Sequence, residues 1–287
     1  MCFLFTIAKY SFLYTLHLQF TMLSKYFRYA LSLSAAALKN HIDLDKKNSM
    51  ADYNAQNHNG SVWDFNWDKR SRGKEMDANL KKVNSKVVRH IIMIRHGQYY
   101  QRREDSSERI LTELGRKQAE VCGDRIRKLI KYFEPIPLTT LFASTMIRAD
   151  QTARIICERI GLPVEKISYD PLLEEGAPVE PEPPKYNWYP EEKKFYEDGA
   201  RIEAAFRKYF HRPEPSQKEP TLEVIVCHAN VIRFFVMRAL QLPINAWARM
   251  NLAHCSLTYV RILENGEVNL VYLGDTGYMP IDMVSYR

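Results

Sequence analysis

The sequence has few cysteines, and no two of them form a metal-binding or disulfide-type pair. The five cysteines are widely spaced, odd in number and without a Cys-x-x-Cys motif, so we interpret them as reduced thiols. Internal repeats at solenoid or propeller periods are also absent. These absences exclude a disulfide scaffold, a zinc site and a repeat array, and favour one domain with appendages for 287 residues. The cysteines are Cys2, Cys122, Cys157, Cys227 and Cys255.

Acidic residues are absent from residues 1–42, which contain scattered Lys and Arg among Phe, Leu, Tyr, Ala and Ser. A long apolar run is also missing, because the uncharged stretch Tyr10–Ser24 has 15 residues, fewer than the ~20 of a spanning helix. A span would have to add Phe3–Ala8 around a snorkelling Lys9. We predict a membrane anchor or mitochondrial targeting segment over 1–42, with a soluble amphipathic extension as the alternative.

Residues 43–85 are rich in Asn, Asp, Lys, Ser and Gly, a composition that indicates a linker. Within it, WDFNWD at residues 63–68 places three large aromatic side chains in five positions. Such a group needs a surface to cover it, either the chain's own domain or a neighbouring subunit.

The net charge of +7 allows nucleic acid, an acidic membrane or a phosphorylated substrate as partner. The basic tract Lys69–Arg89 is not accompanied by any nucleic-acid-binding motif. We therefore interpret it as a solvated linker or a contact with acidic lipid, and expect no nucleic acid partner.

From residue 86 to the C-terminus, short apolar runs alternate with amphipathic helical patterns. Such alternation predicts an α/β domain over 86–287, a three-layer α/β/α sandwich with a mainly parallel sheet. The expected strands are Val87–Ile94, Leu138–Ala143, Leu222–Cys227, Ser256–Leu263 and Val268–Leu273, and the expected helices follow Thr112 and cover about Thr152–Ile160, Glu191–Phe210 and Val231–Leu240.

Residues suited to catalysis follow three of the predicted strands. Arg95-His96-Gly97 follow the first strand, Ser144 and Arg148 the second, and His228-Ala229-Asn230 the strand that ends at Cys227. Ligands of such sheets bind beyond the carboxyl ends of the strands. We therefore expect two histidines and two arginines to meet at one edge, within reach of an acid from the proline-rich loop 171–190.

Taken in order, these motifs resemble the histidine phosphatase superfamily, and the resemblance runs from about Trp63 to the C-terminus. The shared motifs are IRHGQ, LTELGRKQA, the S-x-x-x-R-A of Ser144–Ala149, and VCHANVIR. The acid loop LLEEGAPVEPEPP, the closing LGDTGYMP and the upstream WDFNWD are similar, more narrowly, to mitochondrial serine/threonine-protein phosphatases within that superfamily. Ordered motifs are far more specific than a lone Arg-His-Gly.

The resemblance implies a phosphohistidine mechanism with His96 as nucleophile, because a neutral imidazole can split one difficult displacement into two easier ones. It implies that Arg95 and Arg148 hold the phosphoryl oxygens, that His228 adds a donor, and that Glu175 is the acid and base. No metal or other cofactor is implied, since phosphoryl transfer depends mainly on positioning and charge. The expected substrate-binding residues are Arg95, Gln98, Arg148, His228 and Ala229.

The resemblance also implies partners and a location. It implies a phosphoprotein substrate and a mitochondrial membrane, for which we favour the outer one. In the family the aromatic motif promotes multimer assembly, so we favour a homo-oligomer contact over docking on the chain's own domain. The residues of that contact are Trp63, Asp64, Phe65, Asn66, Trp67 and Asp68.

Two positions depart from the family pattern. Glu174 stands where relatives commonly have Arg, which changes the charge beside the expected acid. His254 lies in Leu252–Ser256, where relatives usually have Asn and Gly. We expect His254 to be an ordinary half-buried histidine at the rim of the site.

Three functions compete on this sequence: a mitochondrial protein serine/threonine phosphatase, a phosphoglycerate mutase or small-molecule phosphatase, and a non-enzymatic scaffold or nucleic-acid binder. The segment Gln98–Leu111 does not resemble the longer acidic and aromatic segment of cofactor-dependent mutases. The complete set of His96, Arg95, Arg148 and His228 argues against a scaffold. The sequence therefore favours the protein phosphatase.

Overall fold

The computed structural model describes residues 63–70, 87–134, 136–186 and 188–286, so the predicted targeting segment 1–42 and most of the predicted linker lie outside the described residues. Within these ranges no helix is both long and apolar enough to cross a bilayer. The strands are β1 (Val88–Arg95), β2 (Leu138–Ala143), β3 (Ile167–Tyr169), β4 (Thr221–Cys227), β5 (Leu257–Leu263) and β6 (Val268–Asp275). The α-helices are α3 (Glu113–Tyr132), α4 (Ile147–Ile160), α5 (Glu192–Tyr209) and α6 (Ala229–Ala239).

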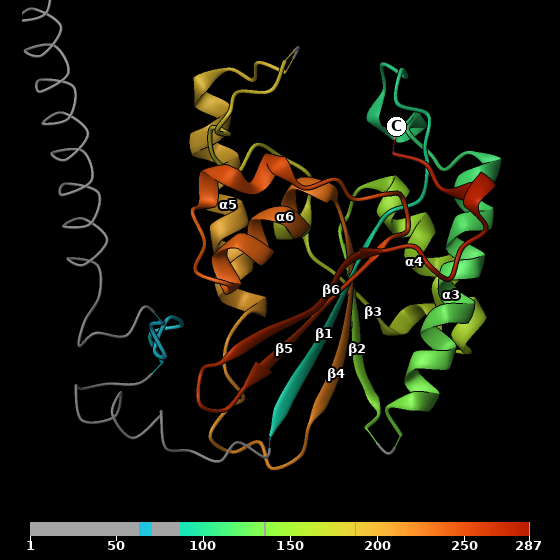
Figure 1. Ribbon diagram of the computed structural model, residues 1–287. Helices are drawn as coiled ribbons and strands as arrows, with labels where there is room; N and C mark the ends of the chain where they lie inside the picture. The colour runs from blue at the N-terminus through green and yellow to red at the C-terminus, as the bar shows by residue number, and fades with distance from the viewer. Residues whose placement is uncertain (1–62, 71–86, 135, 187, 287) are drawn as a thin grey trace, which may run out of the picture. The chain divides into compact units, whose positions relative to one another are not determined.

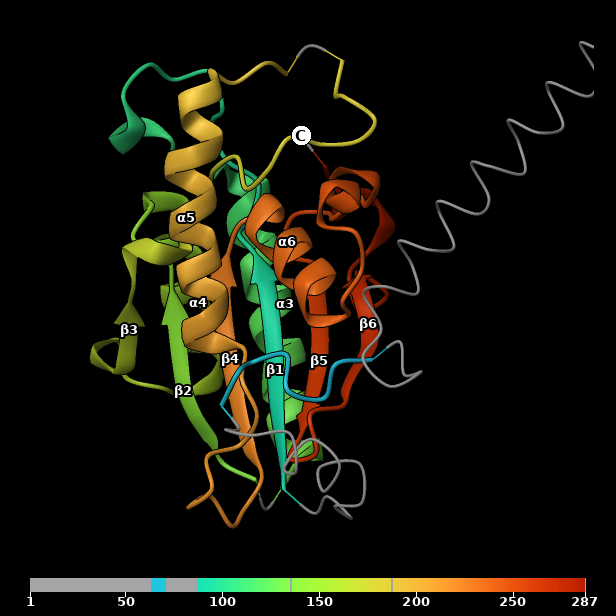
Figure 2. The ribbon, with the colours of Figure 1, turned by 90° about the vertical axis from the view of Figure 1, so that its left-hand side faces the viewer.

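The strands form one sheet in the order β3-β2-β4-β1-β5-β6, which Figure 2 shows face on. The first four strands of that order are mutually parallel, while β5 pairs antiparallel with both β1 and β6. Helices α3 and α4 cover one face and α5 and α6 the other (Figure 1). The predicted three-layer fold with a mainly parallel sheet is confirmed.

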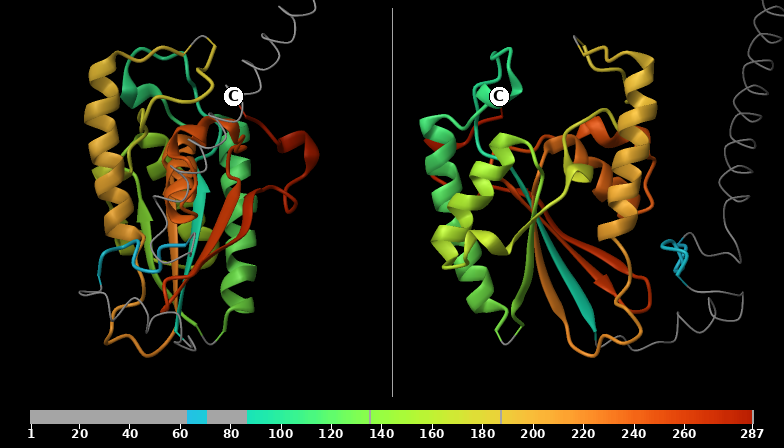
Figure 3. Two further views of the ribbon diagram at one scale, coloured as in Figure 1. Left: turned by 60° about the vertical axis from the view of Figure 1, so that its left-hand side comes forward. Right: turned by 180° about the vertical axis from the view of Figure 1, so that it is seen from behind.

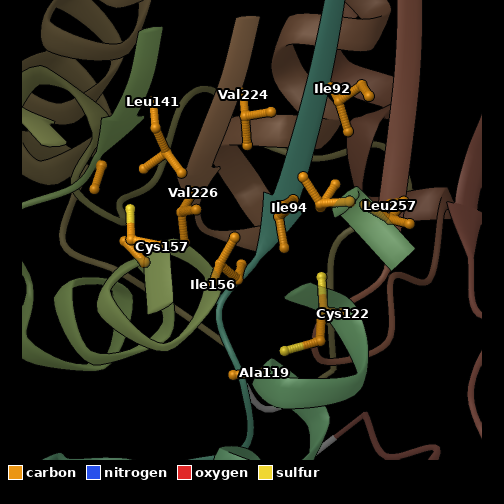
Figure 4. Close-up of a cluster of buried hydrophobic side chains, with 14 of the residues drawn as sticks. Ile92, Ile94, Ala119, Cys122, Leu141, Ile156, Cys157, Val224, Val226 and Leu257 are labelled. Atoms are coloured by element: carbon orange, nitrogen blue, oxygen red, sulfur yellow. The ribbon is translucent and has the colours of Figure 1, made fainter. Parts of the chain in front are cut away.

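The layer formed by α3 and α4 packs through apolar side chains against the strands (Figure 4). Seen from behind in Figure 3, these two helices lie side by side. The opposite layer is aromatic, since Phe210 stacks on Phe206 and contacts Phe235, with 5.2 Å between ring centroids in each pair. The side chains labelled in Figure 4, between α3, α4 and the strands, are Ile92, Ile94, Ala119, Cys122, Leu141, Ile156, Cys157, Val224, Val226 and Leu257.

Helix α3 begins at the motif LTELG for a reason that also shapes the site. The Thr112 hydroxyl accepts a hydrogen bond from the Gly115 N–H at 3.0 Å and so caps the helix. A Cβ on Gly115 would lie 1.9 Å from the carbonyl oxygen of Gln98, and a Cβ on Gly97 would lie 2.6 Å from the carbonyl oxygen of Gly115. The two glycines therefore allow the chain after β1 to pass directly over the start of α3.

Two details of the sheet differ from the sequence prediction. The edge strand β3 has three residues, too few to show a hydrophobic period, and was not expected. Helix α6 begins at Ala229, directly after His228, and not at Val231. The predicted Asn265-Gly266 turn between β5 and β6 is present, with a φ of 94° at Gly266.

Part of the WDFNWD motif docks on the chain's own domain. The Trp67 ring is buried, lies 5.8 Å from Phe206 and donates from Nε1 to the Gly266 carbonyl at 2.9 Å. Asp68 pairs with Arg212, whose Nη2 lies 2.6 Å from Oδ1 and whose backbone N–H donates to Oδ2 at 2.9 Å. The subunit contact that we favoured for the motif stays a prediction, but Trp67 and Asp68 already have partners within one chain.

Candidate active site

The segments that follow β1, β2 and β4 meet at the carboxyl end of the sheet. The His96 N–H donates to the Cys227 carbonyl at 3.0 Å, and the Ser144 N–H donates to the Val226 carbonyl at 3.0 Å. The rings of His96 and His228 are 5.0 Å apart, at 57° to each other. The structure therefore brings together the residues that were predicted from strand ends alone.

His96 is buried, and its protonation can be assigned from its contacts. Its Nδ1 lies 2.8 Å from the Gly97 carbonyl oxygen, which can only accept, so Nδ1 carries the hydrogen. Nε2 is left with its lone pair, at 3.3 Å from Nε of Arg148. Burial, together with the charge of neighbouring His228 and Arg148, lowers the pKa of His96 well below its usual value. The imidazole is therefore neutral, as a nucleophile must be.

The two arginines supply positive charge close to His96. Arg95 donates from Nη1 to the carbonyls of Leu252 at 2.5 Å and Tyr286 at 3.2 Å. Arg148 is buried, with its guanidinium 4.6 Å from the centre of the Tyr99 ring. Burial lowers the pKa of Arg95 to about 10 and also lowers that of Arg148, against the attraction of Glu175. With a pKa of about 10, Arg95 is charged at neutral pH.

His228 is fully buried beside His96 and is oriented by Ser144, whose hydroxyl oxygen is 2.8 Å from Nε2. Burial and the positive charge of Arg148 and Arg95 lower the pKa of His228 well below its usual value. It is also the N-cap of α6, and no side chain caps that helix. The start of α6 is therefore suited to an anion, and the N–H of Asn230 there donates to the Glu175 carboxylate at 3.5 Å. The proposed binding role of Ala229 stays a prediction.

Glu175 reaches the site from the loop after β3 and is half-buried. Its carboxylate accepts from the N–H of Gly176 at 3.2 Å and the N–H of Asn230 at 3.5 Å. Burial raises its pKa above the usual value, despite the opposing charge of Arg148 and Arg95. This carboxyl is thus set up to hold a proton, the property that a general acid needs.

Arg201 and Asn230 hold the acid loop; Asn230 was predicted to follow a strand end but without this role, and Arg201 was not identified from the sequence. Arg201 donates from Nη1 to the Glu174 carbonyl at 2.6 Å and from Nη2 to the Glu175 carbonyl at 3.1 Å. The Asn230 amide donates to the Gly176 carbonyl at 2.9 Å. The sequence signal was present in part, because Asn230 belongs to the motif VCHANVIR, whereas Arg201 belongs to an ordinary amphipathic helix.

Gln98 and Glu174 lie at the edge of this cluster. The Oε1 atom of Gln98 accepts from the Thr112 hydroxyl at 2.8 Å, so this oxygen is engaged in holding the start of α3. The Glu174 carboxylate is hydrogen-bonded to the Thr145 hydroxyl, on the loop that leads into α4. The departure from the family pattern therefore adds negative charge next to the strand-end loop of β2.

The expectation for His254 was wrong. Its side chain is fully buried, and its ring centroid lies 5.7 Å from that of His96. The turn that places it there has a φ of 55° at Cys255, a left-handed conformation that favours glycine. The sequence around His254 does not indicate this turn, so the burial of the His254 side chain was not predicted.

Comparison with known proteins agrees with this geometry. The family model of the histidine phosphatase superfamily (branch 1) matches residues 91–276. The chain is 43% identical over 240 residues to the serine/threonine-protein phosphatase Pgam5, mitochondrial, of Drosophila ananassae, covering 79% of this chain and 81% of that protein. The Drosophila melanogaster Pgam5 is also 43% identical, over 242 residues, covering 79% and 82%.

Among solved structures, Bacillus stearothermophilus YhfR has a TM-score of 0.50 at 21% identity, covering 67% of this chain and 100% of that one. At that identity the likeness shows the fold alone. The family model and the Pgam5 relatives carry the assignment further. The chain belongs to branch 1 of the histidine phosphatase superfamily and is a phosphatase of that family.

Proposed function

We propose that this chain is a mitochondrial protein serine/threonine phosphatase that acts through a phosphohistidine on His96. The observation that carries the proposal is the neutral, buried His96, whose Nε2 accepts from Nε of Arg148 at 3.3 Å in a site that also contains Arg95 and Glu175, a carboxyl with a raised pKa. The names of the 43% identical relatives support a protein substrate and a mitochondrial location.

In the first step, His96 Nε2 attacks phosphorus in line while the bond from phosphorus to the seryl or threonyl oxygen breaks. The Glu175 carboxyl gives its proton to that leaving oxygen. Arg95 and Arg148 balance the charge on the equatorial oxygens, because planar guanidinium groups bind phosphate in a bidentate manner. The products of this step are the dephosphorylated protein and phosphorylated His96.

In the second step, the Glu175 carboxylate takes a proton from water, and the resulting hydroxide attacks phosphorus. The bond from phosphorus to Nε2 breaks, inorganic phosphate leaves, and His96 recovers its lone pair. One carboxyl serves both steps because each step returns it to the form required by the other. The raised pKa of Glu175 supports this shared role.

The test uses the full chain with a phosphothreonine peptide carrying labelled phosphate, quenched within the first turnover at alkaline pH. We expect label on the parent protein and none on His96→Ala, with turnover reduced to background. His211→Asn is the matched control, because His211 contacts the Arg212 carbonyl outside the site. Equal turnover by parent and His96→Ala would reject the nucleophile. Turnover of 3-phosphoglycerate but not of the peptide would indicate the metabolic enzyme instead.

We also propose that WDFNWD contributes to homo-oligomer assembly. The half-buried Phe65 supports this, as does the position of Asp64 on the exposed side of the motif. The variant Phe65→Ser is expected to reduce the particle size in sedimentation without lowering Tm. Trp67→Ala is expected to lower Tm, because Trp67 fills its own domain. An unchanged particle size for Phe65→Ser would contradict assembly through this residue.

For the first 42 residues we propose membrane attachment at the mitochondrion, preferentially at the outer membrane. The support is the absence of acidic residues there and the mitochondrial relatives. Fractionation of cells expressing the full chain is expected to recover it in carbonate-resistant mitochondrial membranes and to show digestion by protease added outside. Loss of residues 1–42 should release the protein. Equal distribution of both forms would contradict the proposal.

A further inference from the structure

A third imidazole stands beside the nucleophile and is not used in the mechanism above. His254 is fully buried, with its ring centroid 5.7 Å from His96 and 6.4 Å from Tyr99. His96 is therefore flanked by two imidazoles, since His228 lies 5.0 Å from it. The question is whether His254 only fills space or contacts the phosphoryl group.

The hydrogen bonds of His254 determine which of its nitrogens is available. Nδ1 lies 2.9 Å from the Ser285 hydroxyl oxygen, and that oxygen already accepts from Gln118 Nε2 at 2.9 Å. The Ser285 hydroxyl has one proton and a second lone pair, so it can donate to Nδ1 of His254 or accept from it. When it donates, the hydrogen of the neutral ring is on Nε2, and this is the tautomer that the proposal below requires.

The Nε2 atom is buried and has no hydrogen-bond partner among the residues that the structure describes. Nε of Arg95 and Nδ1 of His228, which belong to the same site, share that condition over the same ranges, as do five other side-chain atoms. Buried polar groups in proteins are almost always hydrogen-bonded, and an unpaired one is costly. Three such atoms on residues next to His96 favour a polar ligand in this site.

We propose that His254 Nε2 donates a hydrogen bond to an oxygen of the phosphoryl group that His96 receives. The inference rests on the proposed function, and it adds a binding residue within Leu252–Ser256, the stretch that departs from the family pattern in the sequence. His254 would act as a neutral donor beside the charged Arg95 and Arg148. Burial, and then the charge of Arg95, lowers its pKa to about 3, so it stays uncharged through the physiological pH range.

The competing explanation is that His254 only anchors the C-terminal segment. Its backbone N–H donates to the Ser285 carbonyl at 2.8 Å, next to Tyr286, whose carbonyl accepts from Arg95. Loss of that anchor would disturb Arg95 indirectly. A test must therefore separate the Nδ1 side of the ring, which faces Ser285, from the Nε2 side.

Two amide substitutions separate the two sides of the ring. The amide of asparagine reaches about as far as Nδ1 and can keep the Ser285 contact, whereas the amide of glutamine reaches the position of Nε2. Direct calorimetric binding of inorganic phosphate to the full chain gives a readout that needs no turnover. We expect His254→Asn to weaken phosphate binding by about tenfold or more with Tm nearly kept. We expect His254→Gln to bind phosphate like the parent, with a lower Tm.

Ser285→Ala is the matched control, because it removes the Nδ1 partner and leaves Nε2 in place. If it weakens phosphate binding as much as His254→Asn does, or if His254→Asn binds phosphate like the parent, the proposal is overturned. If His254→Gln loses binding while His254→Asn keeps it, anchoring alone explains the residue. Phosphopeptide turnover that still requires His96 in all three variants keeps the proposed function intact in each case, so the two failures are distinguishable.

Discussion

Strand β1 carries an arginine near each end, and the two have opposite surroundings. Arg89 is buried and donates to the Glu223 carboxylate from Nε at 2.9 Å and from Nη2 at 2.7 Å, and its Nη1 donates to two carbonyls. Arg95 donates from Nη1 to main-chain carbonyls, while its Nε has no partner among the described residues. A guanidinium with a complete set of partners stabilises the fold, whereas one with a spare donor can bind an anion.

The carboxyl groups at the two ends of the sheet differ in the same way. Burial would raise the pKa of Asp68, but hydrogen bonds from Arg212 outweigh it and lower that pKa. At the other end, burial wins over the charges of Arg148 and Arg95, and the pKa of Glu175 is raised. The difference is contact, since Asp68 is hydrogen-bonded to its arginine and Glu175 to backbone N–H groups. The first arrangement fixes a charge, and the second keeps a proton exchangeable.

The largest effect is expected from Glu223→Ala, at the end of β1 where Arg89 pairs with Glu223. Arg89 would remain buried without its counter-charge, so the free energy of unfolding should fall by about 3 to 5 kcal/mol. Urea denaturation measures this, and kcat/KM for an aryl phosphate should not change in the folded fraction. Glu219→Ala, at an exposed position, is the control. A loss of stability no greater than the control's would show that the pair is not structural.

Arg95→Leu should mainly lower kcat/KM, whereas Glu223→Ala mainly lowers the free energy of unfolding. The free-energy change is expected to be smaller than for Glu223→Ala. Removing one fixed donor from a charged transition state costs about 10²- to 10³-fold in rate. Stability should fall by less than in Glu223→Ala, because the unpartnered Nε is removed while the carbonyls of Leu252 and Tyr286 each lose one donor. The measurements are kcat/KM and Tm, with the exposed Arg102→Leu as control. A large drop in Tm with kcat/KM kept would erase the contrast between the two arginines.

The residues of the site, unlike the Arg89–Glu223 pair, were predictable from sequence because they lie at strand ends. The apolar run 87–94 stops at Arg95 and His96, and the run 222–227 stops at His228, so the position of each side chain follows from where its strand ends. Arg148 follows the apolar run 138–143 in the same way, and the family resemblance supplied Glu175. The burial of a strand and the residue at which it ends are local properties, and the hydrophobic pattern of the sequence indicates both.

The partners that orient the site were not predictable, because they come from distant segments without a periodic signal. Arg201 reaches the acid loop across 26 positions of sequence, and Ser285 reaches His254 across 31. The sequence also gave no sign that Trp67 would find its partner at Gly266, 199 positions away. Contacts of this kind depend on how the helices pack on the sheet. The hydrophobic pattern of a single helix or strand does not specify which distant residue it will contact.

The raised pKa of Glu175 predicts how kcat/KM depends on pH. Its proton is needed for the first step, so kcat/KM for a phosphothreonine peptide should fall about tenfold per pH unit above the pKa of Glu175. Because that pKa is raised above 4.5, activity should extend to higher pH than an ordinary glutamic acid would allow. No loss is expected near pH 6.5 on the acid side, since the pKa of His96 is lowered. Glu175→Gln should be slow and without the alkaline limb; a limb that persists would assign it to another group.

The smallest effect is the stabilisation of the protein by inorganic phosphate. At a concentration ten times its Kd, a ligand that binds only the folded state adds about 1.4 kcal/mol, which thermal scans with and without phosphate can detect. The parent and Glu223→Ala should gain the same increment from different starting values, because the anion binds at the opposite end of β1. Arg95→Leu should gain much less. An equal gain in Arg95→Leu would place the anion away from the strand ends, and the spare donor of Arg95 would then need another explanation.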